Sequence, residues 1–359
     1  MANWLIYGAA GYTGALIAQE AVKQGLQPIL AGRGDNVRAL ADRLGLSARI
    51  FDLHDLQATE AGLAGVTLVL NCAGPFSATA RSMIAACLAR GVHYLDITGE
   101  IPVFEYAASQ HAVARLRSVI LCPGVGFDVV PTDCVAATLK AALPDATELA
   151  LGFDSRSALS PGTAKTAVEG LAEGGWIRQG GQLTPVPLAY RVRTIDFGFG
   201  PKTAMTIPWG DVSTAWHSTG IPDIACYLAS PPGFITTTRR LNRLRGLLRL
   251  KLVQRLLKWH VARTVHGPSE AKRASQTTAV WGEARNARGD TCTVRVETAN
   301  GYSLTVHSAL AIVARVMGMT TVEGGFYTPS RLCGPAFVES LPGSGKLVLT
   351  RAASESAVP

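Results

Sequence analysis

The stretch WLIYGAAGYTG, residues 4–14, decides the fold. Residues 4–7 form a short apolar run, glycines follow at positions 8, 11 and 14, and residues 15–22 (ALIAQEAV) predict a helix. A strand, a glycine turn and a helix in this order form the phosphate-binding corner of a dinucleotide fold. Gly8 permits the tight turn, Gly11 lets the backbone approach a pyrophosphate, and Gly14 lets the helix pack close to the strand. The N-terminus of the helix then faces the phosphates.

Beyond this corner, apolar runs alternate with helical patterns up to about residue 145. Six strand signals alternating with helices predict a Rossmann-like, doubly wound parallel sheet. The further strands are expected at 28–31, 48–52, 66–71, 93–100 and 118–122, and the further helices at 36–44, 82–90 and 103–117, with another starting near Pro131.

After about residue 145 the strand and helix patterns no longer alternate, which predicts a second, α+β domain with a mixed, largely antiparallel sheet. Strands are expected at 148–154, 189–197, 202–208, 291–298 and 303–308, the last two joined by a hairpin at Asn300-Gly301. Helices are expected at 161–174, 309–317 and 330–340, followed by a marginal tail from residue 343. We therefore predict a dinucleotide-binding domain at 1–130, a substrate and dimerisation domain at 131–318 with an insert at 237–264, and a segment at 319–359 that returns to the first domain.

Arg33 follows the second predicted strand, where an NAD-specific fold places an acid for the ribose 2′-hydroxyl. Arginine at this position suits a 2′-phosphate, so we predict NADP(H), with a solvated loop arginine as the alternative. Asp52 would lie near the adenine, although an exposed strand-end acid is equally consistent. The predicted cofactor-binding residues are Gly8, Ala10, Gly11, Tyr12, Thr13, Gly14, Arg33, Asp52, Cys72, Ala73, Gly74, Pro75, Thr98, Gly99, Glu100, Gly126 and Phe127.

The composition describes a globular protein, with 48% hydrophobic and 17% charged residues. Seven cysteines without a C-x-x-C pair predict reduced thiols in the cytoplasm and no metal site. No apolar run reaches the ~18 residues of a membrane span. The net charge of +8 is localised, because residues 239–273 alone contribute +10.

Residues 239–263 combine nine cations with leucines at three- and four-residue spacing. This pattern predicts a basic amphipathic helix that could lie on an anionic membrane, dock an acidic carrier protein or cover the substrate pocket. A surface helix packed on the core by its apolar face has the same periodicity. Nucleic-acid binding is not expected, because no aromatic interleaving accompanies the charge.

Several segments together resemble the saccharopine dehydrogenase-like oxidoreductases, particularly the bacterial branch that includes trans-acting enoyl reductases. They are GAAGYTG (8–14), AGR (31–33), LNCAGPF (70–76), YLDITGE (94–100), GFDVVPTD (126–133), PWGDVSTA (208–215), STGIP (218–222) and EGGFYTPSRLCG (323–334). The resemblance implies a Rossmann domain, a mixed-sheet second domain, NADP(H) and a homodimer. It does not imply saccharopine as substrate, because the sequence locates no cationic groups for several carboxylates.

Hydride transfer requires a positioned nicotinamide and one proton donor. Candidate catalytic residues are Asp128, which either contacts substrate or anchors its loop, Asp211, which could instead cap a helix, and His217, which could be an exposed loop histidine. We expect enoyl C=C reduction of an apolar, membrane-borne or carrier-linked substrate. Imine or amino-acid chemistry is the enzymatic alternative, and a dinucleotide-binding scaffold at a lipid surface is the non-enzymatic one.

Overall fold

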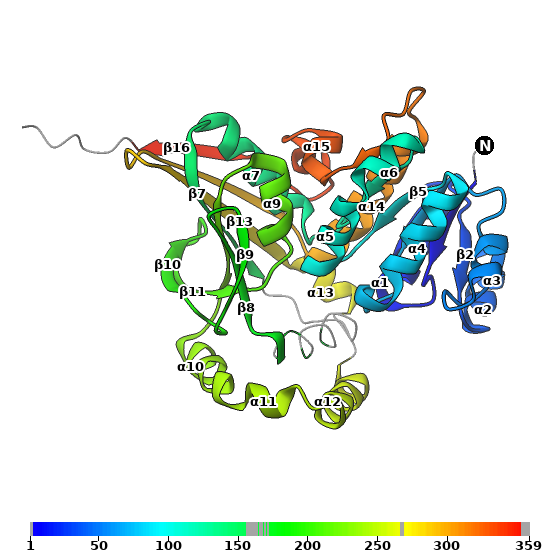
Figure 1. Ribbon diagram of the computed structural model, residues 1–359, viewed down its shortest axis with the longest axis horizontal. Coiled ribbons are helices and arrows are strands. Elements are labelled where there is room, and N and C mark those ends of the chain that lie inside the picture. Colours follow the sequence, from blue (N-terminus) through cyan, green and yellow to red (C-terminus); the bar gives the residue numbers. More distant parts are fainter. Residues whose placement is uncertain are drawn as a thin grey trace, which may run out of the picture. The chain divides into compact units, whose positions relative to one another are not determined.

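The computed structural model describes residues 3–155, 172–265 and 269–352, together with residues 164, 168 and 170. The chain divides into two compact units. Unit 1 comprises residues 1–130 and 302–333, and unit 2 comprises residues 131–301 and 334–359. Figure 1 shows the elements of both units.

Unit 1 is the predicted Rossmann-like fold. Its sheet contains β1 (Trp4–Tyr7), β2 (Ile29–Gly32), β3 (Ala48–Ile50), β4 (Leu68–Asn71), β5 (His93–Asp96), β6 (Ile120–Cys122) and β15 (Gly325–Phe326). All pairings are parallel and the strand order is β15-β6-β5-β4-β1-β2-β3. The order reverses between β1 and β4, which is where open α/β sheets bind their ligands.

The helices of unit 1 follow the strands in the expected alternation. They are α1 (Tyr12–Lys23), α2 (Asn36–Leu44), α3 (Leu56–Gly62), α4 (Phe76–Arg90), α5 (Ile101–Ser109), α6 (His111–Leu116), α14 (Gly301–Met317) and α15 (Pro329–Cys333). The buried strands β1, β4 and β5 supply the centre of the core, where Tyr7, Met83 and Tyr94 are among the largest fully buried side chains.

Unit 2 is built on a mixed sheet of nine strands, also as predicted. The strands are β7 (Ala146–Ser155), β8 (Gly175–Gln179), β9 (Gln182–Val186), β10 (Val192–Asp196), β11 (Pro201–Ile207), β12 (Asp223–Ala229), β13 (Thr277–Asn286), β14 (Thr291–Ala299) and β16 (Val348–Ala352). Among the described residues of unit 2, β12 and β7 pair in parallel and the other pairings are antiparallel.

Helices of unit 2 include α7 (Val130–Ala142), which lies against β13, because a Cβ at Gly282 would be 2.9 Å from Leu139. The others are α9 (Asp211–Thr219), α10 (Pro232–Leu241), α11 (Arg245–Leu248), α12 (Lys251–Thr264) and α13 (Glu270–Ser275), with short 3₁₀ turns η1 (Asn242–Leu244) and η2 (Phe337–Ser340). The helix predicted at 161–174 lies largely outside the described residues.

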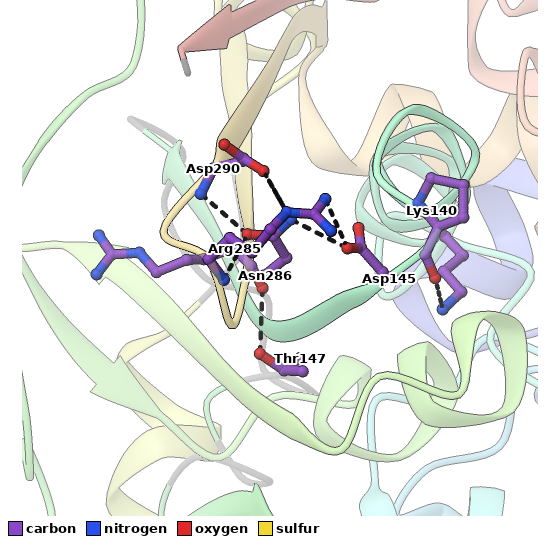
Figure 2. Close-up of polar contacts among 8 residues, drawn as sticks. Lys140, Asp145, Thr147, Arg285, Asn286 and Asp290 are labelled. Carbon is purple, nitrogen blue, oxygen red and sulfur yellow. Dashed lines mark hydrogen bonds and ion pairs between the residues drawn. The ribbon is translucent and has the colours of Figure 1, made fainter. Parts of the chain in front are cut away.

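A buried asparagine organises the turn between β13 and β14. Asn286 donates to the carboxylates of Asp145 and Asp290 at 3.1 and 2.9 Å, and its own side-chain oxygen accepts the Asp290 N–H (Figure 2). Thr147, one residue into β7, donates to the carbonyl of Arg285 at 3.4 Å. These contacts tie the hairpin to the start of the central strand of unit 2.

Among the elements that differ from the sequence-based expectation are one predicted strand and the C-terminal tail. Residues 303–308 are not a strand, because they lie within the long helix α14. Asn300-Gly301 is not a hairpin turn, because it is the junction between β14 and α14. Leu304, Ser308, Ile312 and Val316 are buried at helical spacing, which a six-residue window cannot distinguish from strand alternation. The tail is not marginal up to residue 352, because β16 pairs with β14.

The domain boundaries also differ from the expected ones beyond residue 130. Helix α14 and residues 319–333 group with unit 1, whereas residues 334–352 group with the sheet of unit 2.

Candidate active site

The loops that follow β1, β4, β5 and β6 lie at one edge of the parallel sheet of unit 1. The turn at Gly8 approaches the loop after β4, since a Cβ at Gly8 would lie 2.7 Å from the Ala73 nitrogen. The loops after β5 and β6 also meet, since a Cβ at Gly99 would overlap the Asp128 carboxylate. The structure therefore brings together the predicted cofactor residues at 8–14, 72–75 and 98–100 with the loop that carries Asp128.

The glycine turn has the geometry expected of a phosphate cradle. Gly8 has a φ of +79°, which glycine adopts without strain, and the N–H of Gly11 donates to the Gly8 carbonyl at 3.0 Å. A Cβ at Gly14 would overlap the Gly8 carbonyl oxygen, so only glycine lets α1 pack this closely. Gly11 precedes α1 in an extended conformation, and no side chain caps the helix. This arrangement fits a phosphate that accepts hydrogen bonds from the first turn.

Arg33 fits the role of a 2′-phosphate ligand. It is exposed and follows the last residue of β2. Burial raises the pKa of Tyr7 to about 12, with Asp52 adding to the rise and the positive charge of Arg33 opposing it, so both charges lie near the end of β1. Asp52 accepts the His54 N–H at 3.0 Å, which gives its carboxylate a structural contact in the loop after β3. Its predicted place near the adenine stays a prediction.

The loop after β4 is shaped by polar side chains at strand ends. Fully buried Asn71 accepts the Ala73 N–H at 3.1 Å and donates to Tyr94 and Thr79. Thr79 in turn donates to the Ala73 carbonyl at 2.7 Å. The prediction had not singled out Asn71 or Tyr94. A polar residue at the end of an otherwise apolar strand was the available signal.

Glu100 was predicted to contact the cofactor, but its carboxylate caps a helix. Its two oxygens accept the N–H groups of Phe76 and Ser77 at 2.8 and 2.7 Å, at the N-terminus of α4. An acid at this end of a helix is stabilising, because it satisfies free N–H groups and the helix dipole. Glu100 therefore holds the start of α4, directly after the loop at residues 72–75, and its predicted contact with the cofactor stays a prediction.

Asp96 is a completely buried carboxyl at the centre of this edge. It accepts hydrogen bonds from the Tyr94 hydroxyl at 2.7 Å and from the N–H groups of Thr98 and Gly124, each at 2.9 Å. Burial raises its pKa from 3.8 to about 6, and the three hydrogen bonds oppose this rise. Asp96 thus joins the loops after β5 and β6.

The raised pKa of Asp96 gives a pH dependence to stability. Between the unfolded pKa of 3.8 and the folded value of about 6, the folded protein binds more protons than the unfolded chain. The free energy of unfolding therefore rises as the pH falls through this window, by up to ~3 kcal/mol from this group. Denaturant unfolding of the wild type and of Asp96→Asn at pH 4 to 7 measures this contribution of Asp96 to the free energy of unfolding. A constant difference between the two across this range would contradict the account.

The loop at residues 125–128 is held by α14. Thr305 accepts the Phe127 N–H at 2.9 Å, and Ser308 donates to the Val125 carbonyl at 2.7 Å. Gly126 was expected to allow backbone approach to the cofactor, but it is buried and a Cβ there would lie 2.9 Å from Thr305. Gly126 is therefore needed for packing against α14. The two cis peptide bonds, Gly74–Pro75 and Asp128–Val129, lie in the loops after β4 and β6.

The other two catalytic candidates lie on α9 in unit 2. Asp211 is completely buried and accepts a hydrogen bond from Thr132 of α7 at 2.8 Å. Burial raises its pKa well above 3.8, and nearby Asp133 adds to the rise. Asp211 thus links the first turns of two helices, and its catalytic role stays a prediction. His217 is half-buried in the last turn of α9.

Unit 2 also contains an open cavity of about 360 Å³ lined by four arginines, Arg178, Arg191, Arg193 and Arg285. Arg178 is buried and bonded to the carbonyls of Val212 and Gly181, and Arg193 pairs with Glu283 at 3.0 Å. Arg191 and Arg285 are exposed and form no ion pair with a carboxylate in the described part of the chain.

The arginine-lined cavity was not predicted from the sequence. Arg178 lies in β8, Arg193 in β10 and Arg285 in β13, while Arg191 directly precedes β10. The strands β8 and β13 were not predicted. The alternation of Arg191 with Arg193 and of Glu283 with Arg285 marked one face of each strand. Only the fold reveals that these faces enclose the same space.

Comparison with known proteins agrees with the geometry of unit 1. Residues 4–120 match the family described as the saccharopine dehydrogenase NADP binding domain, so this part of the chain is an NADP-binding domain. A trans-acting enoyl reductase of Mycobacterium leprae is 33% identical over 144 residues, which are 36% of this chain and 33% of that protein. A saccharopine dehydrogenase-like oxidoreductase of Rattus norvegicus is 26% identical over 214 residues, covering 51% of this chain and 50% of that protein.

A solved structure has the same fold over the whole chain. Apo saccharopine dehydrogenase (L-Glu forming) from Saccharomyces cerevisiae superposes with a TM-score of 0.66 at 12% identity, covering 98% of this chain and 100% of that one. At this identity the match establishes the fold alone. The matched regions span between a third and a half of the length of the curated relatives named above.

Proposed function

We infer, because residues 4–120 belong to the saccharopine dehydrogenase NADP binding domain family, that the chain is an NADPH-dependent oxidoreductase. The observation that carries this inference is the glycine turn at 8–14, uncapped by any side chain and followed at the next strand by Arg33. We propose that it reduces an enoyl C=C bond by hydride transfer.

The roles of the chain's own residues follow from their places at the sheet edge. The turn at Gly8–Gly14 would hold the pyrophosphate and Arg33 the 2′-phosphate, while the loop at residues 73–75 would form the wall on the nicotinamide side. NADPH supplies the hydride, so the protein has to orient the substrate and deliver one proton. We propose Asp128 for substrate positioning and His217 for the proton. Asp211 stays a candidate for this role, with its buried carboxyl bonded to Thr132.

The relative from Mycobacterium leprae supports the choice of an enoyl substrate by its name, since it is called a trans-acting enoyl reductase. We propose a carrier-linked or lipid-linked acyl chain as the substrate class. A homodimer and a location in the cytoplasm, with peripheral attachment to a membrane, remain part of the same proposal.

Amino-acid or imine (C–N) chemistry is the second candidate, favoured by the arginine-lined cavity of unit 2. Exposed Arg191 and Arg285 could bind a substrate carboxylate there, which supplies cationic groups that the sequence had not located. The third candidate, a non-catalytic dinucleotide-binding scaffold at a lipid surface, requires only unit 1 and the basic segment.

Consumption of NADPH with two substrate panels distinguishes the candidates. We expect oxidation of NADPH with 2-enoyl thioesters and none with cyclic imines or with 2-oxo acids plus ammonia. His217→Asn is expected to lower kcat by ~100-fold or more, as for loss of a general acid, while NADPH affinity is retained. The reverse substrate preference would establish the C–N reading, and NADPH binding without turnover of either panel would favour the scaffold.

A further inference from the structure

The basic segment, residues 232–264, has a surface that is both positively charged and rich in exposed apolar side chains. It comprises α10, η1, α11 and α12, which follow one another along unit 2 (Figure 1). It contains nine lysines and arginines and no aspartate or glutamate. The segment therefore carries a positive charge that its own residues do not neutralise.

Many of the large apolar side chains of the segment are exposed. Six large apolar side chains between residues 244 and 259 are 51% to 70% exposed: Leu244, Leu247, Leu250, Leu252, Leu256 and Trp259. The last three share one face of α12, at positions i, i+4 and i+7. A helix packed on the core by its apolar face, the alternative left open by the sequence, would bury these residues.

Ile235 of α10 packs with Ala189 and Met205, and several polar contacts attach the rest of the segment to unit 2. Asn242 bonds both the N–H and the carbonyl of Leu188, at 2.8 and 3.0 Å. Arg245 donates to the Glu173 carbonyl, Arg249 to Ala172 at 3.3 Å and Gln254 to Val168 at 3.2 Å. The usual arrangement, with apolar residues inward and polar residues outward, is thus reversed along much of the segment.

We propose that the basic segment is a docking surface for an anionic membrane, with the leucines of α12 inserted at the boundary between headgroups and acyl chains. Lys251 and Arg255 flank the leucine face and are exposed, which suits contact with lipid phosphates. Trp259, on whose ring Arg263 stacks at 4.0 Å, combines an apolar ring and a cation at the depth of the headgroups. No helix in the described part of the chain is long and apolar enough to cross a membrane.

A membrane fits the surface better than a protein does. A second copy of this chain would bring two like-charged segments together, which is repulsive. An acidic protein would complement the cations, but the outward leucines extend over consecutive helices, from Leu244 in η1 to Trp259 in α12. An anionic membrane has a broad apolar layer beneath negatively charged headgroups, so it complements both the exposed leucines and the cations of the basic segment. This inference does not depend on the reaction that unit 1 catalyses.

Vesicle sedimentation with the full-length protein tests the proposal. We expect binding to phosphatidylcholine vesicles that contain phosphatidylglycerol and little binding to phosphatidylcholine alone. Lys251→Gln with Arg255→Gln is expected to lower the partition coefficient roughly 10–30-fold. Leu252→Gln with Leu256→Gln is expected to lower it by at least about tenfold. Brominated lipids should quench part of the tryptophan fluorescence, and Trp259→Phe should remove that quenching.

The matched control is Leu56→Gln with Leu116→Gln, which replaces two leucines of unit 1 that are 64% and 86% exposed. This variant should bind vesicles as the wild type does, and all variants should keep the wild-type NADPH affinity. Equal binding to both kinds of vesicle, no binding to either, or undiminished binding of the α12 leucine variant would each overturn the proposal.

Discussion

Replacement of Gly14 by alanine is expected to weaken NADPH binding by ~10–100-fold while leaving the chain folded. A Cβ at this position would overlap the Gly8 carbonyl oxygen and lie 3.0 Å from the Ala9 Cα, both of which are backbone atoms of the turn. The turn and α1 must therefore move apart. Overpacking of this kind costs ~1–3 kcal/mol of free energy. If NADPH binds only the undistorted turn, this cost reduces its affinity by the same free energy. Fluorescence titration with NADPH measures the change.

Gly45→Ala is the matched control for this variant. Gly45 ends α2 with a φ of +67°, and a Cβ there would meet no atom within 4 Å. Alanine at this position strains the backbone by ~1–2 kcal/mol, so it lowers stability without touching the turn. We expect it to bind NADPH as the wild type does. Wild-type affinity in Gly14→Ala, with the fold confirmed by circular dichroism, would show that the turn is not the phosphate site.

Arg33→Ala is expected to reduce NADPH affinity by ~10–100-fold and to leave NADH affinity unchanged. Hydrogen bonds to a charged group contribute ~1.5–3 kcal/mol, and the guanidinium of Arg33 is the cation placed to bind the 2′-phosphate that NADH lacks. The dissociation constants of NADPH and NADH, measured for the wild type and for Arg33→Ala, give the change in the preference for NADPH directly.

Arg38→Ala controls for the loss of positive charge near the site. Arg38 is exposed on α2 and pairs with Asp35 at 3.8 Å, so its removal should leave the preference for NADPH intact. An equal fall in NADPH affinity for Arg33→Ala and Arg38→Ala would indicate general electrostatic attraction. A wild type that binds NADH as tightly as NADPH would contradict the assignment of Arg33.

The sequence predicted unit 1 well because its signals are local. Each buried strand is a short apolar run, and each helix follows with its own periodicity, so order and pairing come from general rules of parallel sheets. Unit 2 was predicted only in class. The strands β8, β9, β12, β13 and β16 were missed. Helix α14 was divided between a strand and a helix, because short apolar runs fit both periods.

The candidate site was predictable where backbone geometry dictates the residue. Gly8, Gly14 and Arg33 stand where a general rule places them, whereas Glu100 and Gly126 have roles that arise from tertiary contacts. Glu100 caps a helix that begins 24 residues earlier, and Gly126 packs against a helix from the other end of the chain. Long-range contacts of this kind have no signature in a single sequence.

The most direct test of the central claim is the transfer of deuterium to a 2-enoyl thioester from NADPH that carries deuterium at both C4 positions of the nicotinamide. If the chain is an NADPH-dependent enoyl reductase, mass spectrometry will find one deuterium on a carbon of the former double bond, and Gly14→Ala will form this product more slowly. A product without deuterium, or an enzyme that binds NADPH but transfers no label to enoyl or imine substrates, would contradict it.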